Sequence, residues 1–219
     1  MSKEEGEPTS RLMDLGLKEL MNLLIEMGRL SEQTVSSAIE AYIGGKDEVE
    51  NIKRMSEELR TLEDEVSDLS TDIIAKYQPM ASDLRFTKSC VEISYGFSRL
   101  GRYAYDIAET IQSLGDVSNC DHDLVLKTAE LAKKMISMSV QALLSRDTEL
   151  ASSIPALDDE VDRNYRMFMK NLSSDVHISA KCAASTALVL KYLERIADHA
   201  SYIGDSIVYV ATGNHKPRK

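Results

Sequence analysis

The chain has 219 residues, 43% of them apolar, which is enough to bury one large or two small cores and excludes a disordered or collagen-like protein. The 10 glycines, 4 prolines and absence of tryptophan favour long helices over many short strands, so we expect an all-α fold. The 26 basic residues are outnumbered by 36 acidic ones, and the net charge of −10 would repel nucleic acid and anionic lipid head groups.

The sequence also indicates the cellular compartment in which the protein works. Cys90, Cys120 and Cys182 form no C-x-x-C pair and are odd in number, which indicates neither a zinc ribbon nor a disulfide framework and suits a reducing cytosol. No apolar run approaches the roughly 18 to 20 residues that span a bilayer, and the acidic start MSKEEGEPTS is unlike a secretory signal. We therefore expect a cytoplasmic protein that is not inserted in a membrane.

The first half of the chain predicts three helices after a flexible tail at residues 1–10. Apolar residues recur in steps of three and four over 13–27, 52–73 and 93–114, which is the stripe of a core-facing helix. Turn residues separate the three segments: Gly44-Gly45, Pro79 and Gly115.

The second half repeats this organisation. Apolar stripes cover 124–138, 157–172 and 189–210, and Gly213 ends the last helix before a basic tail at 214–219. Pro155 either opens the fifth helix or kinks it near its start. The sequence thus predicts six long helices.

Two sets of three helices indicate an internal duplication. LEDEV at 62–66 in the second helix matches LDDEV at 157–161 in the fifth. SRLGRYAY at 98–105 in the third helix matches ERIADHAS at 194–201 in the sixth. We therefore predict two similar three-helix repeats, at 11–115 and 116–213.

Four carboxylates form a candidate metal site in the second repeat. Asp158 and Asp162 lie four residues apart, as do Glu194 and Asp198, so each pair projects from one helix face. If the two helices are neighbours, four hard oxygen ligands could converge on a cation such as Mg²⁺, Mn²⁺, iron or Ca²⁺. The alternative is an ordinary solvated acidic face. His199 points away from Asp198 on the helical wheel and is left out of the site.

Motifs for other chemistry are missing: the chain has no G-x-S-x-G, no P-loop and no G-x-G-x-x-G. Periodicity alone therefore leaves the function open.

Two segments carry a resemblance to a known family. IIAKYQPMASDLR at 73–85 closely resembles the QP-x-ASDLR turn of PhoU proteins, and YLERIADHA at 192–200 resembles their LERIADHA segment. The resemblance implies two tandem three-helix bundles, commonly dimeric, in a cytoplasmic regulator of phosphate uptake with no reaction of its own. Such proteins restrain the phosphate-specific ABC transporter, with its ATPase as the expected partner, and in many bacteria couple it to a sensor histidine kinase.

Some members of that family carry metal clusters on E/D-x-x-x-D motifs, one set per bundle. By resemblance, Asp158, Asp162, Glu194 and Asp198 form a full set in the second repeat, and we expect a metal ion or cluster there, with iron, Mn, Zn, Mg and Ca all possible. In the first repeat Ser98 and Arg102 replace two acids. The facing pair is either Glu63 and Ser67 or Ser56 and Arg60, and neither restores two carboxylates, so we predict no metal in the first repeat.

Two other functions compete with this one. The chain could regulate a different transporter or an ion channel, because PhoU-like domains accompany other membrane complexes too. A carboxylate-bridged metal enzyme is disfavoured, because such sites typically add Glu-x-x-His pairs and the acidic site has none. The leading interpretation is a non-enzymatic regulator that acts by protein contact at the periphery of membrane complexes.

Overall fold

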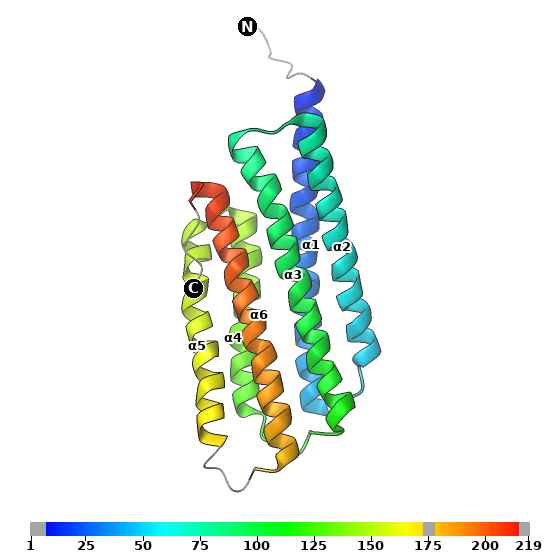
Figure 1. Ribbon diagram of the computed structural model, residues 1–219, viewed down its shortest axis with the longest axis vertical. Coiled ribbons are helices and arrows are strands. Elements are labelled where there is room, and N and C mark those ends of the chain that lie inside the picture. The colour runs from blue at the N-terminus through cyan, green and yellow to red at the C-terminus, as the bar shows by residue number, and fades with distance from the viewer. Residues whose placement is uncertain (1–7, 173–177, 215–219) are drawn as a thin grey trace.

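The computed structural model describes residues 8–172 and 178–214, and within them it contains six α-helices and no strand (Figure 1). This confirms the predicted all-α fold and the number of helices. Their bounds are α1 (Pro8–Gly44), α2 (Val49–Tyr77), α3 (Ala81–Leu114), α4 (Asp123–Ser145), α5 (Thr148–Leu172) and α6 (Ala180–Thr212).

Two helix starts differ from the expectation. Helix α1 begins at Pro8, inside the predicted tail, while 1–7 and 215–219 lie outside the described residues. Helix α5 begins at Thr148, so Pro155 lies inside it and does not open it. The earlier start has a local cause, because Asp147 Oδ1 accepts the backbone N–H groups of Glu149 and Leu150 at 3.0 and 2.9 Å.

The predicted glycine stops are confirmed. Gly115 follows α3 with φ 74° and donates its N–H to the Ile111 carbonyl at 2.8 Å. Gly213 follows α6 with the same φ and donates to Tyr209 at 2.8 Å. Both positions need the left-handed backbone that glycine adopts without penalty.

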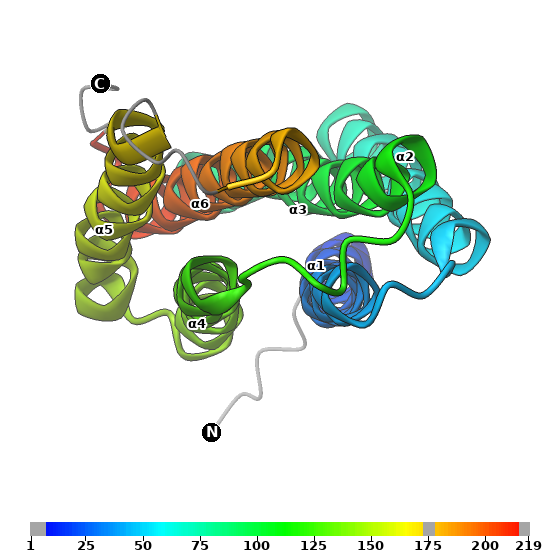
Figure 2. The same ribbon diagram turned by 90° about the horizontal axis from the view of Figure 1, so that it is seen from below.

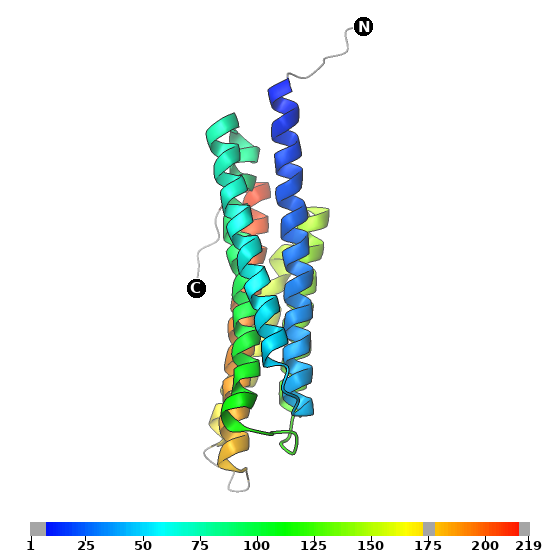
Figure 3. The ribbon, with the colours of Figure 1, turned by 90° about the vertical axis from the view of Figure 1, so that its right-hand side faces the viewer.

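The helices form two three-helix bundles, α1–α3 and α4–α6, joined along one side. Helices α3 and α6 lie next to each other in one layer, and α1 and α4 lie next to each other in a second layer (Figures 2 and 3). The buried stripes meet in a core that crosses from one bundle to the other and contains Leu59, Phe97 and Leu193, all fully buried. Burial of these stripes is the main source of stability.

The cysteine pattern indicated no disulfide framework, but the structure contains one disulfide. Cys120 in the segment between α3 and α4 forms a disulfide with Cys182 in the first turn of α6, across 62 residues of sequence. Only the tertiary fold brings these two cysteines together, so their spacing in the sequence did not predict the disulfide. Cys90 is free and buried in α3, and burial raises the pKa of its thiol. None of the described helices has the length and apolar character needed to cross a membrane.

Candidate functional site

The four predicted carboxylates lie on the neighbouring helices α5 and α6. Asp158 and Asp162 are on α5, and Glu194 and Asp198 are on α6, which packs against α5. Partial burial raises the pKa of Asp198, and the charges of Glu194 and Asp162 act in the same direction, against the lowering effect of Arg195. Glu194 and Asp162 are thus close enough to Asp198 to influence its charge state.

Each of these three acids also has a basic partner on its own helix. Arg166 contacts Asp162 at 3.3 Å, Arg195 contacts Asp198 at 3.1 Å, and Lys191 pairs with Glu194. Within residues 8–172 and 178–214, no group of three or more His, Cys, Asp and Glu side chains is placed to hold a metal ion. In this side-chain arrangement the three acids contact basic partners on their own helices, and the metal on the second repeat stays a prediction.

In the first repeat, the equivalent helix faces enclose a pocket of about 330 Å³ between α2 and α3, here called the α2–α3 pocket. It is lined by Ser56 and Arg60 from α2 and by Ser98 and Arg102 from α3. Glu63 lines it too, but Ser67 does not. Of the two alignments left open by the sequence, the pairing of Ser56 and Arg60 with α3 therefore describes this face better.

The seam between the repeats holds an aromatic cluster around His199. Its ring centroid lies 5.9 Å from that of Tyr95, and 5.7 Å from those of Tyr103 and Tyr202. Burial lowers the pKa of His199 to about 4, with Arg99 and Arg195 acting in the same direction. His199 is therefore a neutral side chain at the α3–α6 seam at neutral pH.

The family-like turn between α2 and α3 has an unusual backbone. Gln78 ends α2 with φ 49° and donates its N–H to the Ile74 carbonyl at 3.1 Å, and Ala81 opens α3 with φ 48°. Positive φ is uncommon for residues other than glycine, so the surrounding structure must hold this turn in shape.

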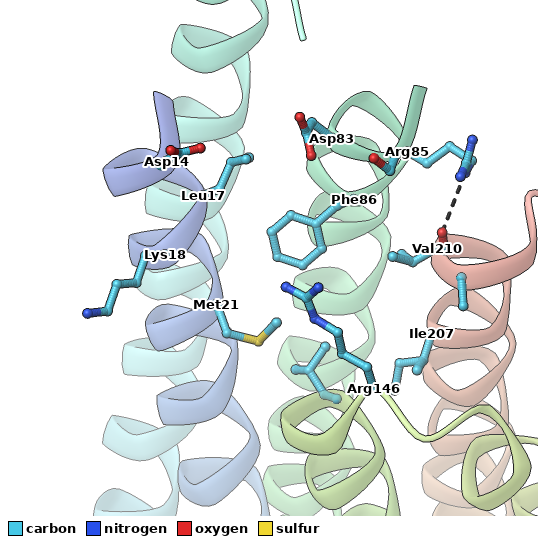
Figure 4. Close-up of a pocket in the computed structure, with 13 residues that line it drawn as sticks. Asp14, Leu17, Lys18, Met21, Asp83, Arg85, Phe86, Arg146, Ile207 and Val210 are labelled. Carbon is cyan, nitrogen blue, oxygen red and sulfur yellow. Dashed lines mark hydrogen bonds between the residues drawn. The ribbon is translucent and has the colours of Figure 1, made fainter. Parts of the chain in front are cut away.

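A pocket of about 650 Å³, here called the end pocket, lies beside this turn (Figure 4). Four helices meet at it: the start of α1, the start of α3, and the ends of α4 and α6. Its apolar wall includes Leu17, Met21, Phe86, Ile207 and Val210, and its charged groups are Asp14, Lys18, Asp83, Arg85 and Arg146.

Two arginines shape the end pocket. Arg85 Nε donates to the Val210 carbonyl at 3.4 Å, which ties the start of α3 to the end of α6. Arg146 follows α4 with φ 55°, and its guanidinium reaches into the pocket toward Phe86 (Figure 4). In the sequence, residues 78–85 carry the family resemblance, but no pattern there predicts a role at a site.

The segments of α1 and of the α2–α3 turn that line the end pocket also carry exposed apolar side chains. Leu12 and Leu15 on α1 are 55% and 58% exposed, while Met80 and Leu84 at the turn are 80% and 41% exposed. Along the chain, each of them lies one or two positions from a residue that lines the pocket. We call these four residues the apolar rim. Exposed apolar groups gathered beside charged groups are typical of a protein contact surface.

Known proteins resemble this chain over nearly its whole length. The PhoU domain model matches residues 24–111 and 125–207. Two proteins named phosphate-specific transport system accessory protein PhoU homolog, from Clostridium acetobutylicum and Zymomonas mobilis, are 29% and 30% identical to it. These alignments cover 94% and 96% of this chain, and 96% and 91% of the relatives.

Among solved structures, PhoU from Pseudomonas aeruginosa superposes with a TM-score of 0.83 at 25% identity, covering 92% of this chain and 99% of that one. The phosphate transport system regulatory protein PhoU from Streptococcus pneumoniae has the same fold, with a TM-score of 0.85 at 22% identity over 94% of this chain and all of that one. Two domain matches, one in each repeat, and these full-length likenesses show that the chain belongs to the PhoU family.

Proposed function

We propose that this chain is a regulator of phosphate uptake that restrains a phosphate-specific ABC transporter by contact with its ATPase, and so contributes to phosphate homeostasis. The relatives named as accessory proteins of the phosphate-specific transport system support this assignment. In this proposal the chain catalyses no reaction and acts by binding to its partner.

The observation that carries the proposal is the end pocket with its apolar rim. The most family-specific segment of the sequence, QPMASDLR, forms one wall of this pocket and contributes Met80 and Leu84 to the rim. Burial of such apolar side chains drives protein association, and the charged groups beside them provide specificity. This end of the molecule therefore offers the ATPase both an apolar anchor and charged contacts.

The test measures binding of the purified chain to the transporter ATPase by biolayer interferometry. We expect the double variant Met80→Ser/Leu84→Ser to weaken binding at least about tenfold, because both side chains lie exposed on the proposed contact surface. Leu126→Ser is the matched control: this leucine is 41% exposed but lies in the first turn of α4, at the opposite end of the molecule.

The outcomes test two things separately: which surface of the chain makes the contact, and which transporter it binds. If Leu126→Ser weakens binding as much as the double variant, the end pocket is not the contact surface. If the wild-type chain binds no phosphate transporter ATPase, the proposal is wrong, and capture of another transporter's ATPase would favour the alternative client.

We extend the proposal to a cytoplasmic homodimer that works at the periphery of the membrane complex, with a sensor histidine kinase as a further partner. These features come from the family resemblance. Light scattering on the purified chain tests the dimer, and co-purification from phosphate-replete cells tests the kinase.

A further inference from the structure

The α2–α3 pocket differs in charge from the rest of the molecule. Its walls carry four basic side chains, Lys53, Arg60, Arg99 and Arg102, against two acidic ones, Glu57 and Glu63. The whole chain has the opposite balance, with 26 basic and 36 acidic residues. A local excess of positive charge in an otherwise acidic protein attracts anions to the α2–α3 pocket.

The basic side chains of α2 are available to a ligand. Within residues 8–172 and 178–214, neither Lys53 nor Arg60 makes an ion pair. Arg102, in contrast, contacts Asp106 at 2.7 Å and lies over the Tyr105 ring at 5.2 Å, so it is held in place at the pocket wall.

Arg99 supplies an unused donor. Its Nη2 donates to the Tyr103 hydroxyl at 2.9 Å, and its guanidinium lies 4.7 Å from the centre of that ring. Its Nε is buried and has no hydrogen-bond partner among the described residues. A buried N–H without an acceptor is unfavourable, so an oxygen of a bound anion would satisfy it.

The remaining walls suit a small oxyanion. Ser56 and Ser98 add hydroxyl donors from the two facing helices. The volume of about 330 Å³ is at the small end of the range for ligand sites, about 300–1,000 Å³. Guanidinium groups bind phosphoryl oxygens with paired, charge-assisted hydrogen bonds.

We propose that the α2–α3 pocket binds a phosphoryl group, either inorganic phosphate or the phosphate of a small metabolite, with Lys53, Arg60 and Arg99 as its main contacts. At the equivalent positions of the second repeat, Glu194 and Asp198 would repel the same ligand. This site does not depend on which transporter the chain regulates.

Isothermal titration calorimetry at low salt tests the proposal with inorganic phosphate and with adenosine 5′-monophosphate, and sulfate serves as the competing oxyanion. We expect one saturable site per chain for at least one of the two phosphoryl ligands, with weaker binding of sulfate. Tighter binding of inorganic phosphate identifies the free ion as the ligand, and tighter binding of the nucleotide identifies a phosphorylated metabolite.

Variants place the site. Lys53→Gln and Arg60→Gln should each raise the dissociation constant at least about tenfold, through loss of one charge-assisted contact. Arg54→Gln makes the same charge change on the same helix, but Arg54 is exposed, bonds to Asn51 at 2.9 Å and does not line the pocket, so its dissociation constant should stay within about twofold. Absence of saturable binding, sulfate binding as tight as phosphate, or an equal loss in Arg54→Gln would overturn the proposal.

Discussion

The two repeats share a buried framework and differ in the charge of one helix face. Phe97 in α3 and Leu193 in α6 occupy matching positions, and both are fully buried in the common core. On the neighbouring face, Ser98 and Arg102 of the first repeat stand where the second has Glu194 and Asp198. The difference shows that packing fixes the repeated stripe, whereas the partly exposed face beside it can take either sign of charge.

The largest expected effect comes from the shared core. Phe97→Ala should lower the free energy of unfolding by about 3–5 kcal/mol and Leu193→Ala by about 2–5 kcal/mol, because each leaves a cavity in a fully buried site. Urea unfolding followed by circular dichroism should show a single transition that shifts in both variants, since the core is continuous across the repeats. Two transitions, of which each variant shifts only one, would show that the repeats unfold separately.

The framework could be predicted because its signals are local. The apolar stripes of α2, α3 and α6 follow helical periodicity and contain Leu59, Phe97 and Leu193, respectively. Gly115 and Gly213 end α3 and α6 where the apolar pattern stops. These features need only the order of residues along one helix, so the sequence contains them in full.

The second largest effect separates the repeats. The disulfide Cys120–Cys182 ties the segment before α4 to α6, and the first repeat has no counterpart among the described residues. Loss of a bridge that closes 62 residues should cost about 2–4 kcal/mol, so Cys182→Ser should unfold at lower urea than the oxidised wild type. In reducing buffer the two proteins should unfold alike. Equal stability under oxidising conditions would contradict a disulfide in the folded protein.

The parts of the site that sequence reasoning missed depend on how helices face one another. Helical spacing along α2 allows either Ser56 and Arg60 or Glu63 and Ser67 to face α3, and the packed structure favours the first pair because both of its members line the α2–α3 pocket. One signal was available: Arg166, Lys191 and Arg195 lie three or four residues from the predicted metal ligands, at the spacing of ion pairs within a helix.

A smaller effect concerns the seam. The pKa of His199 is about 4 in the folded chain and 6.5 when unperturbed. Between these two pH values the imidazole is protonated in the unfolded chain but neutral in the folded chain. Stability should therefore fall as the pH drops from about 6.5 toward 4, and His199→Gln should reduce that slope. Tyr103, the matching residue of the first repeat, carries no imidazole to titrate there. An NMR titration that places the His199 midpoint near 6.5 would contradict this.

The last prediction asks whether the second repeat uses its acidic face for a metal. A metal ion at Asp162 and Asp198 would replace the ion pairs that these carboxylates make with Arg166 and Arg195. Because both ion pairs are partly exposed and therefore weak, metal coordination can offset their loss. We expect elemental analysis of purified protein to find metal that is lost in Asp162→Ala/Asp198→Ala and retained in Ser56→Ala/Ser98→Ala, the matched change in the first repeat. Metal-free wild-type protein, or equal loss in both variants, would mean that the acids serve only their basic partners and that neither repeat is a metal site.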